Sequence, residues 1–320
     1  MVDLSVSIVN WNGGETIAKC LRSLADATHD MEVEMIVVDN ASTDESVEFL
    51  HKEFPDLRLI QNDENKGYAF GNNQAFRTSR GRYFLILNND VMVKGDALEE
   101  MVRYMDGHPD VGLLGGRLQN PSGTFQPSAN RRFPNLLDVF LEEIFFLSSL
   151  KYVFLKTSLG AKCSTLFWNF KEAQPVAWVG GACMLVRRHS FEEVCLLDDH
   201  FFFYREDCDL CLRMKKRGWK VVYHPRCLFV HHWGHSSRKN QRKISMESRR
   251  SLLYYFQKHH GRFGFWTAKS FLLAGLLLRV FLLFLKSLFK TGERERLLLF
   301  KEMISIFAKM RNPSDALPIR

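Results

Sequence analysis

The sequence alternates between short strand-like runs and longer stretches with helical periodicity, and this alternation most constrains the fold. Apolar, strand-like runs occur at residues 4–9, 35–38, 57–60 and 83–87. Helical patterns are expected at 16–27, from 42–45 onward, at 68–78 and at 96–105. Strands that alternate with helices predict an α/β fold with a mostly parallel central sheet and helices on both of its faces.

Three of the predicted strands end in polar residues. These ends are Asn10-Trp11-Asn12, Asp39-Asn40-Ala41-Ser42 and Asn88-Asn89-Asp90. Ligands in open α/β sheets bind beyond the carboxyl ends of the strands, so we expect the three ends to line one binding site. A single polar loop after a strand indicates little, but three polar loops at one edge of the sheet favour a binding site.

The rest of the chain is less regular. Residues 119–175 mix turn residues with an aromatic and aliphatic stretch, which predicts an insertion over the sheet. In the block that follows, a strand is predicted at 176–186, a helix at 206–217, and strands at 220–223 and 227–230. We expect a sheet domain over 1–235, a basic helical extension over 236–267 and amphipathic helices over 268–320.

Charge is divided unevenly along the chain. Residues 1–209 hold 20 basic and 31 acidic residues, a net charge of −11, whereas residues 210–320 hold 24 and 5, a net charge of +19. Together they give the +8 of the whole chain. The acidic part can supply carboxylates to a cation or a reaction, and the basic part suits phosphates of nucleic acid or of an anionic membrane.

Cysteine usage and the amino-terminal residues indicate a cytoplasmic protein. The 7 cysteines are odd in number and lack the spacing of a disulfide framework, which favours a reducing compartment. Cys208 and Cys211 form an isolated pair, whereas a zinc site needs further ligands. Asp3 and Ser5 interrupt the first apolar run, so no secretory signal is expected.

Five motifs occur in the order found in family 2 glycosyltransferases, and the chain resembles the bacterial rhamnosyltransferase-like branch. They are Val6 to Asn12, Val37 to Asp44, Asn65-Lys66-Gly67, Leu87 to Asp90, and Glu206 to Asp209. The resemblance runs from about residue 4 to about residue 262. It implies a GT-A (Rossmann-like) fold, a nucleotide-sugar donor and inversion at the anomeric carbon. A dinucleotide-dependent enzyme is disfavoured, because no Gly-x-Gly-x-x-Gly follows the first strand.

The resemblance implies a set of residues that bind the donor nucleotide. Asp39, at a strand end, can accept a hydrogen bond from a pyrimidine ring N–H. The segment that contains Gly67 is expected near the base, although this glycine could equally serve a turn. The full implied set is Val9, Asn10, Trp11, Asp39, Asn40, Asn65, Gly67, Asn88 and Asn89.

A divalent cation would stabilise the charge that develops on the leaving diphosphate. Asp90 is the expected ligand, although Asn88-Asn89-Asp90 stands where many relatives carry Asp-x-Asp. The resemblance adds a histidine after the last strand, with His231 preferred over His232 and His235. Carboxylate and imidazole ligands would suit Mg²⁺ or Mn²⁺.

Inversion by direct displacement needs a carboxylate that takes the proton of the acceptor hydroxyl. The resemblance points to Asp207 as this base, with Glu206 as the second choice. Neighbouring like charges raise the pKa of a carboxyl, which suits a base. The residues implied for the donor or acceptor sugar are Gly181, Ala182 and Asp209.

The last third of the chain predicts membrane attachment. Residues 271–285 carry Arg279 as their single charge, but a spanning helix needs about 20 apolar residues. Four cations fall on one helical face, namely Lys269, Arg279, Lys286 and Lys290. This predicts a basic amphipathic helix in the plane of an anionic membrane surface, with a second one at 297–307. The same faces could instead pack on the catalytic domain or on a second subunit.

These patterns favour an inverting, metal-dependent glycosyltransferase with its catalytic domain at 1–235. The expected donor is thymidine diphosphate rhamnose, and the expected acceptor is a glycan or lipid-linked sugar of cell-surface polysaccharide synthesis. The expected location is peripheral, on the cytoplasmic face of the membrane, with no nucleic-acid partner and homo-oligomerisation left open. The alternatives are a glycosyltransferase-like binding protein without activity and a basic nucleic-acid-binding protein.

Overall fold

The computed structural model describes residues 2–28, 31–145, 171–232, 241–287 and 294–312. It divides into two compact units. The sheet unit comprises Met1–Phe133 and Lys171–Gln241, and the helical unit comprises Pro134–Phe170 and Arg242–Arg320. The division falls inside the predicted insertion and after Gln241.

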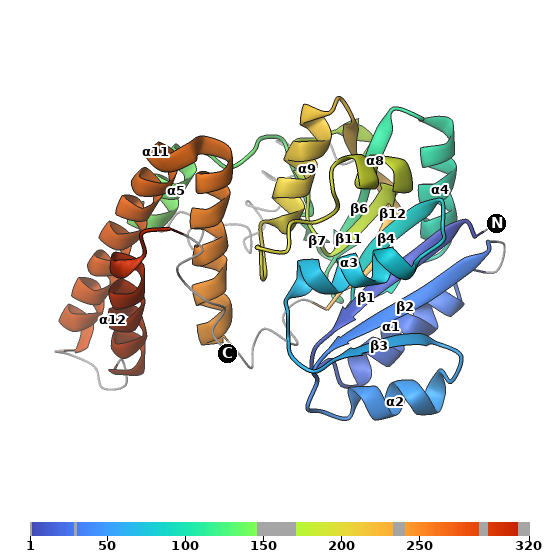
Figure 1. Cartoon of the computed structure of the whole chain (residues 1–320), viewed down its shortest axis with the longest axis horizontal. Helices are drawn as coiled ribbons and strands as arrows, with labels where there is room; N and C mark the ends of the chain where they lie inside the picture. The colour runs from blue at the N-terminus through green and yellow to red at the C-terminus, as the bar shows by residue number, and fades with distance from the viewer. Residues whose placement is uncertain (1, 29–30, 146–170, 233–240, 288–293, 313–320) are drawn as a thin grey trace. The chain divides into compact units, whose positions relative to one another are not determined.

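The first half of the sheet unit follows the predicted alternation (Figure 1). Its elements are β1 (Leu4–Asn10), α1 (Glu15–Ala25), β2 (Val33–Asn40), α2 (Ser46–Glu53), β3 (Arg58–Asn62), α3 (Tyr68–Thr78) and β4 (Tyr83–Asn88). The strands lie in the order β3-β2-β1-β4, and every pair among them is parallel. Their carboxyl ends therefore meet at one edge, as predicted, and the α/β fold class is confirmed.

The second half completes a mixed sheet. Its main elements are β5 (Val91–Val93), α4 (Ala97–Gly107), β6 (Val111–Gln119), β11 (Cys183–Arg187), α8 (Arg188–Glu193), α9 (Glu206–Lys216) and β12 (Lys220–His231). The strand order continues β4-β11-β6-β12-β5. Strand β11 is antiparallel to both of its neighbours, and β6 and β12 are parallel. Short strands complete it: β7 (Phe125–Gln126) pairs with β6, and β9 (Gln174–Pro175) pairs with β12.

Three local predictions differ from the structure. The strand predicted at 176–186 is two strands, β10 (Trp178–Val179), which pairs with β8 (Ala129–Asn130), and β11. The strands predicted at 220–223 and 227–230 are one strand, β12, with an irregular register between His224 and Leu228. Strand β6 has no predicted counterpart, because its glycines hide the apolar pattern.

The glycines of β6 are required by close packing. A Cβ on Gly115 would lie 2.7 Å from the side chain of Val179, and one on Gly116 would lie 2.5 Å from the ring of Phe229. A real Cβ cannot approach its neighbours so closely. The strand is therefore glycine-rich because Val179 on β10 and Phe229 on β12 pack directly against its backbone.

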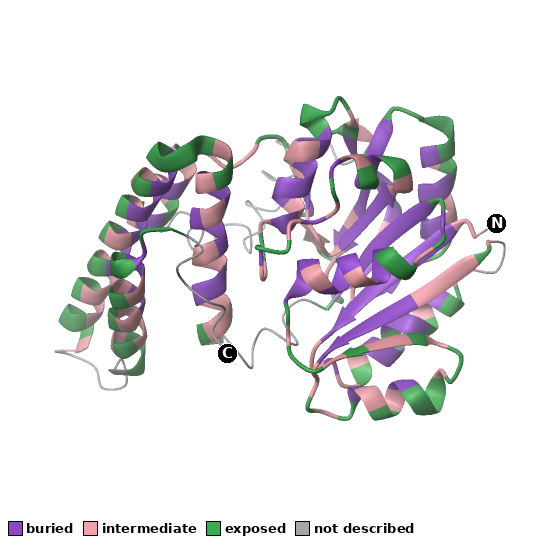
Figure 2. Ribbon diagram, viewed as in Figure 1, coloured by how far each residue is buried: buried purple, intermediate pink, exposed green. Residues whose placement is uncertain are grey.

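The central strands are covered on both faces by helices. Every residue of β1 is buried, and five of the six residues of β4 are buried (Figure 2). Helix α1 contributes Ile17, Leu21 and Leu24 to this core. Continuous burial is typical of parallel strands between two helical layers, and it explains why these strands are continuously apolar.

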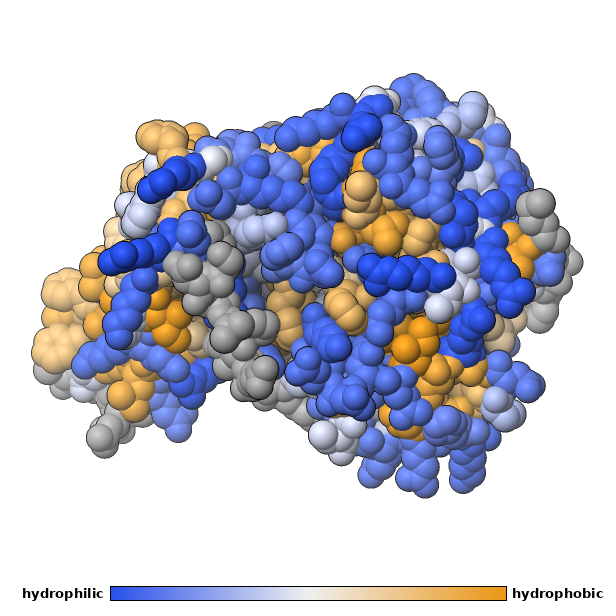
Figure 3. All heavy atoms as spheres, in the orientation of Figure 1, coloured by the Kyte–Doolittle hydropathy of each residue, from blue (hydrophilic) through white to orange (hydrophobic). Residues whose placement is uncertain are grey.

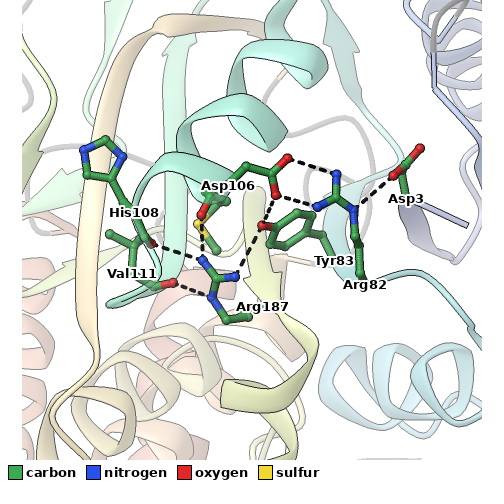
Figure 4. A network of polar contacts seen from close by, with 8 residues as sticks. Asp3, Arg82, Tyr83, Asp106, His108, Val111 and Arg187 are labelled. Atoms are coloured by element: carbon green, nitrogen blue, oxygen red, sulfur yellow. Dashed lines mark hydrogen bonds and ion pairs between the residues drawn. The ribbon is translucent and has the colours of Figure 1, made fainter. Parts of the chain in front are cut away.

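A polar network secures α4 at the edge opposite the carboxyl ends (Figure 4). Arg187, at the end of β11, donates hydrogen bonds to three backbone carbonyls at the end of α4 and the start of β6. The Tyr83 hydroxyl donates to Asp106 over 2.7 Å, and Arg82 pairs with both Asp106 and Asp3. Arg187 thereby satisfies carbonyls that a helix end leaves without partners.

The helical unit contains α5 (Leu136–Phe145), α11 (Gln241–Ser287) and α12 (Arg294–Lys309). Helix α11 is two helices joined at Gly261, whose φ of 64° and ψ of −162° are not helical. The ring of Phe140 on α5 packs edge-on against Phe271 on α11, with centroids 5.2 Å apart. Buried Leu272 and Phe307 contribute to the apolar interior of this unit.

Two cations expected on the basic face of α11 instead serve the interior of the helical unit, which corrects that prediction. Arg279 donates to the buried carboxylate of Glu143 over 2.6 Å. Lys269 is 4% exposed, and its Nζ donates to the carbonyl of Met310 over 2.6 Å. Lys286 is exposed, and Lys290 lies outside the described residues. Helical spacing alone does not show which of these cations face the interior of the unit.

By length and composition, helix α11 is able to cross a membrane, and 28% of its most apolar 18-residue window is buried. The core helix of a soluble protein meets the same criterion, so this one helix does not distinguish a spanning from an in-plane arrangement.

Candidate active site

The carboxyl ends of β1 and β2 are joined by buried amide and carboxylate side chains. Asn10 donates from Nδ2 to Oδ1 of Asp39 over 2.8 Å, and its Oδ1 accepts from Nδ2 of Asn89 over 3.1 Å. Asp39 also accepts the backbone N–H of Ser42 over 2.9 Å. One asparagine thus links the loops that follow β1, β2 and β4. The structure brings together the three strand ends that the sequence singled out.

A second set of contacts fixes the loop before α3. Asn40 donates to the carbonyl of Gly67 over 3.0 Å, and Asn65 accepts the N–H of Gly67 over 3.0 Å. Gly67 has a φ of 95°, and a Cβ there would lie 2.7 Å from the carbonyl oxygen of Phe202. The glycine is therefore required by its conformation and by the close approach of this loop. Asn40 and Asn65 thus both hydrogen-bond to Gly67 and hold this loop in place.

The remaining residues predicted for the nucleotide differ in exposure. Val9 is buried against α3, where a Cβ on Gly71 would meet its methyl group at 2.9 Å. Trp11 and Asn88 are half-buried. The backbone N–H of Asn88 donates to the carbonyl of Ala182 over 3.0 Å, so the end of β4 is fixed to the loop before β11.

Asp90 and His231 lie side by side, as the metal-site prediction requires. Oδ1 of Asp90 is 3.2 Å from Nε2 of His231, and both residues are buried. Among the described residues, neither Asp90 Oδ1 nor His231 Nδ1 has a hydrogen-bond partner. Two neighbouring ligands of an octahedral cation at about 2.1 Å stand about 3 Å apart. A carboxylate oxygen and an imidazole nitrogen at this separation fit Mg²⁺ or Mn²⁺.

A second group of ligand-type side chains lies on the surface. Asp198, Asp199 and His200 place carboxylate and imidazole atoms within 4.8 Å of one another. His200 and Asp199 are exposed. Exposed acidic groups are common without a metal, so the buried pair at Asp90 is the better candidate.

The predicted base and its neighbour begin helix α9. Asp207 accepts the backbone N–H of Gly181 over 2.9 Å and that of Cys208 over 2.7 Å. Glu206 is 4% exposed, and its Oε2 has no hydrogen-bond partner among the described residues. The helix dipole favours negative charge at this end. Two backbone N–H groups thus stabilise the Asp207 carboxylate, whereas Oε2 of Glu206 accepts a hydrogen bond from none of the described residues.

The pKa values of the two carboxyls follow from these surroundings. Burial and the adjacent charge of Asp207 raise the pKa of Glu206 well above its ordinary value. Burial also raises the pKa of Asp207, against the lowering effect of the amides of Gly181 and Cys208. These surroundings favour the neutral form of Glu206, whereas the two amides favour the charged form of Asp207.

Two tyrosines that sequence reasoning missed lie near the acidic pair. The Tyr68 hydroxyl donates to the carbonyl of Gly181, whose N–H donates to Asp207, and Tyr204 comes two residues before Glu206. Burial raises the pKa of Tyr68 and of Tyr204, and the charge of Glu206 raises both further. Tyr68 directly follows the Asn-Lys-Gly motif, and this was the available signal.

The backbone before α9 is strained. Tyr204 and Arg205 have φ values of 67° and 73°, in the left-handed region that side chains other than glycine rarely adopt. Such conformations persist where the surrounding structure enforces them, and they cluster at functional sites. Here they turn the chain so that α9 begins with the acidic pair.

The placement of Asp209 argues against the predicted sugar contact. Its side chain is fully buried, and its carboxylate accepts from Nε of Arg213 over 2.8 Å. Arg213 in turn donates to the carbonyl of Val194. Asp209 therefore joins α9 to the preceding loop, while Gly181 and Ala182 remain beside the acidic pair and β4.

A mostly parallel sheet that gathers an aspartate–histidine pair and an acidic pair at one edge defines the GT-A class of glycosyltransferases. Two solved structures share the fold. One is the mannosyltransferase PcManGT from Pyrobaculum calidifontis in complex with GDP-Man and Mn²⁺, with a TM-score of 0.52, 17% identity, and coverage of 96% of this chain and 86% of that one. The other is S. aureus TarS 1–349 in complex with UDP-GlcNAc, with a TM-score of 0.53 and 15% identity. That match covers 96% of this chain and 80% of the TarS chain.

The chain belongs to glycosyl transferase family 2, whose model matches residues 5–195. It is 27% identical over 313 residues to N-acetylglucosaminyl-diphospho-decaprenol L-rhamnosyltransferase of Mycobacterium tuberculosis, covering 91% of this chain and 96% of the relative. It is also 27% identical over 180 residues to rhamnosyltransferase WbbL of Escherichia coli K12, covering 53% of this chain and 63% of the relative. The family resemblance seen in the motifs is confirmed.

Proposed function

We propose that this glycosyltransferase moves rhamnose, with inversion, from thymidine diphosphate rhamnose to a lipid-linked or glycan acceptor in cell-surface polysaccharide synthesis. The two rhamnosyltransferase relatives support rhamnose as the transferred sugar, and the name of the first relative supports a lipid diphosphate acceptor. The observation that carries the reaction type is the carboxylate of Asp207, which accepts two backbone N–H groups beside the buried carboxyl of Glu206.

In the proposed reaction, Asp207 takes the proton of the acceptor hydroxyl. The hydroxyl oxygen then forms a bond to the anomeric carbon from the face opposite the diphosphate, and the bond from that carbon to the diphosphate oxygen breaks. The nucleoside diphosphate leaves with the bonding electron pair. A base with a pKa above the usual aspartate range accepts this proton more readily at neutral pH.

Asp90 and His231 are the residues that would hold Mg²⁺ or Mn²⁺. When bound, the cation supplies positive charge to the diphosphate oxygens as they become the leaving group. The unpartnered Oδ1 of Asp90 and the short distance to His231 Nε2 support this role.

The end of β2 is the proposed nucleotide site. Asp39 is fixed by Asn10 and Ser42, so its carboxylate is held ready for a pyrimidine N–H. Asn89 positions Asn10 from the other side. Trp11 and Asn88 are half-buried at the same edge, and we assign them to the nucleotide or ribose.

The helical unit is the proposed site of attachment to the cytoplasmic face of the membrane. Large apolar side chains are exposed on α11 and α12, namely Leu277, Phe281, Leu282, Phe284, Leu285 and Leu298. Orange, hydrophobic residues gather over this unit in Figure 3. Because Arg279 pairs with Glu143 and Lys269 donates to backbone carbonyls inside the unit, we propose that apolar insertion, not a basic face, holds the protein on lipid.

The experiment that tests the proposed activity uses donors alone. Nucleotide sugars are screened by thermal shift with Mn²⁺, and release of nucleoside diphosphate is then measured with and without a chelator. Thymidine diphosphate rhamnose is expected to give the largest shift and a chelator-sensitive release. A larger shift with another nucleotide sugar would replace the proposed donor, and no release with any donor would reject the activity.

A further inference from the structure

Tyr68 contacts two loops that lie beside the acidic pair. It is the first residue of α3 and is 9% exposed. Its hydroxyl donates to the carbonyl of Gly181 over 2.9 Å, and its backbone N–H donates to the carbonyl of Phe202 over 2.9 Å. One residue therefore fixes the loop before β11 and the loop before α9 at the same time.

Gly181 is the link between the phenol and the base. Its N–H donates to Oδ2 of Asp207 over 2.9 Å, while its carbonyl accepts from Tyr68. It follows Gly180, and two successive glycines leave a backbone with unusual conformational freedom. The direction of the Gly181 N–H is therefore set by the hydrogen bonds around it, and the phenol supplies one of them.

The neighbouring contacts hold the loop at its ends. The N–H of Gly180 donates to the carbonyl of Ser128 over 2.7 Å, and Ala182 accepts from the N–H of Asn88 over 3.0 Å. Between these two anchors, Gly181 contacts two side chains, the Tyr68 hydroxyl at its carbonyl and the Asp207 carboxylate at its N–H. The Tyr68 ring also packs edge-on against Phe203, with centroids 6.4 Å apart, which restricts the phenol itself.

We propose that Tyr68 is a positioning residue for the transfer reaction: its hydroxyl fixes Gly181 so that the Gly181 amide orients the Asp207 carboxylate toward the acceptor. This inference rests on the proposed role of Asp207 as the base. The hydroxyl itself takes no proton in the reaction. Tyr68 also follows Gly67, which Asn40 holds beside the proposed nucleotide site, so the base is anchored to the donor-binding edge.

Tyr68→Phe removes the hydroxyl and keeps the ring. Donor hydrolysis with thymidine diphosphate rhamnose and Mn²⁺ is expected to show a kcat lowered roughly 10- to 100-fold, since a small misplacement of a reacting group costs this much. The donor Kd, measured by calorimetry, is expected to stay within about twofold. Without the Tyr68 hydroxyl, the Gly181 N–H is no longer held toward Asp207, so the charged form of Asp207 loses stabilisation. The acidic limb of the pH profile of kcat is therefore expected to move to higher pH.

Tyr104→Phe is the matched control, because it removes a phenol hydroxyl from α4, where the ring stacks on His108. This control is expected to keep the wild-type kcat and pH profile. Thermal unfolding of both variants separates a folding defect from misplacement of the base. A Tyr68→Phe enzyme with wild-type kcat, or with a lowered kcat and an unmoved acidic limb, would overturn the inference.

Asp207→Asn in the same assay separates this inference from the proposed function. If Asp207→Asn is inactive and Tyr68→Phe behaves like the wild type, the inference alone fails. If Asp207→Asn hydrolyses the donor at the wild-type rate, the proposed base is wrong and the role of Tyr68 falls with it.

Discussion

Oδ1 of Asp90 lies 3.2 Å from Nε2 of His231, although the two residues belong to opposite thirds of the chain. Antiparallel pairing of β5 with β12 brings them together, with His231 opposite Val91. The pairing places an imidazole beside the last residue of the Asn-Asn-Asp motif. A short three-residue strand therefore completes the proposed metal site.

Removing either ligand is expected to weaken metal binding. Asp90→Asn and His231→Gln keep the shape of each side chain but replace a charged oxygen or a ring nitrogen with an amide. The Kd for Mn²⁺, measured by calorimetry with donor present, is expected to rise roughly 10- to 100-fold. His200→Gln, in the exposed Asp198–His200 group, serves as the control and is expected to leave this Kd unchanged. A larger effect from His200→Gln would move the metal site to the surface group.

The two carboxyls of the acidic pair are expected to respond differently to amide substitution. Asp207→Asn removes the charged base, so kcat for donor hydrolysis is expected to fall roughly 10²- to 10⁴-fold with donor affinity nearly intact. Glu206→Gln replaces a carboxyl that is not the proposed base and whose pKa burial raises, so most of the turnover is expected to remain. The reverse ranking of the two variants would make Glu206 the base.

Activity is expected to depend on the charged form of Asp207. Burial raises the pKa of this carboxyl, so activity is lost as the pH falls through a value above the ordinary aspartate pKa of about 3.9. The check is the pH profile of kcat/KM for donor hydrolysis, with thermal unfolding followed at each pH. An acidic limb at or below the ordinary aspartate value, in protein that remains folded, would contradict the environment described for Asp207.

Asn10→Ala is expected to weaken donor binding through Asp39 and Asn89. The asparagine is fully buried, and its loss removes one donor to Asp39 and the acceptor of the Asn89 Nδ2 group, while Ser42 still donates to Asp39. The free energy of unfolding is expected to fall by about 1–3 kcal/mol, the cost of unsatisfied buried polar groups. Calorimetric titration with thymidine diphosphate measures the Kd at a temperature where the variant is folded. An unchanged Kd would remove this strand end from the proposed nucleotide site.

Membrane binding is expected to depend on apolar side chains of α11. Phe281 is 56% exposed, and burying such a side chain contributes about 1.5–3 kcal/mol, so Phe281→Ser should weaken vesicle affinity roughly tenfold or more. Flotation with phosphatidylcholine vesicles, with and without phosphatidylglycerol, measures this affinity. Lys286→Gln is the control for an electrostatic contribution.

The same assay distinguishes lipid from a second protein subunit. If Phe281→Ser floats like the wild type, or if only Lys286→Gln and added salt release the protein, apolar insertion is wrong. If light scattering shows a dimer that Phe281→Ser dissociates while flotation is unchanged, the exposed face binds a second copy of the chain.

Sequence patterns predicted the parts of this molecule that depend on local order. The strand ends at Asn10, Asp39 and Asp90 converge as expected, because parallel strands with short connections must share an edge. Helix α3 begins and ends where its periodicity and the preceding glycine predict. These features need no knowledge of distant contacts.

Features that depend on distant contacts were missed. The glycines of β6 reflect neighbours on β10 and β12, and Arg279 faces inward because Glu143 on α5 lies beside it. The role of Tyr68 depends on Gly181, far along the chain, so no local pattern could reveal it.

The stereochemistry of transfer tests the central claim most directly. Proton NMR can follow the sugar that the wild-type enzyme first releases from thymidine diphosphate rhamnose, before its anomers equilibrate in solution. Direct displacement assisted by Asp207 predicts that the first-formed sugar has the anomeric configuration opposite to that of the donor. A first-formed sugar with the donor configuration would contradict the account, because it requires a second displacement that a single base at Asp207 does not provide.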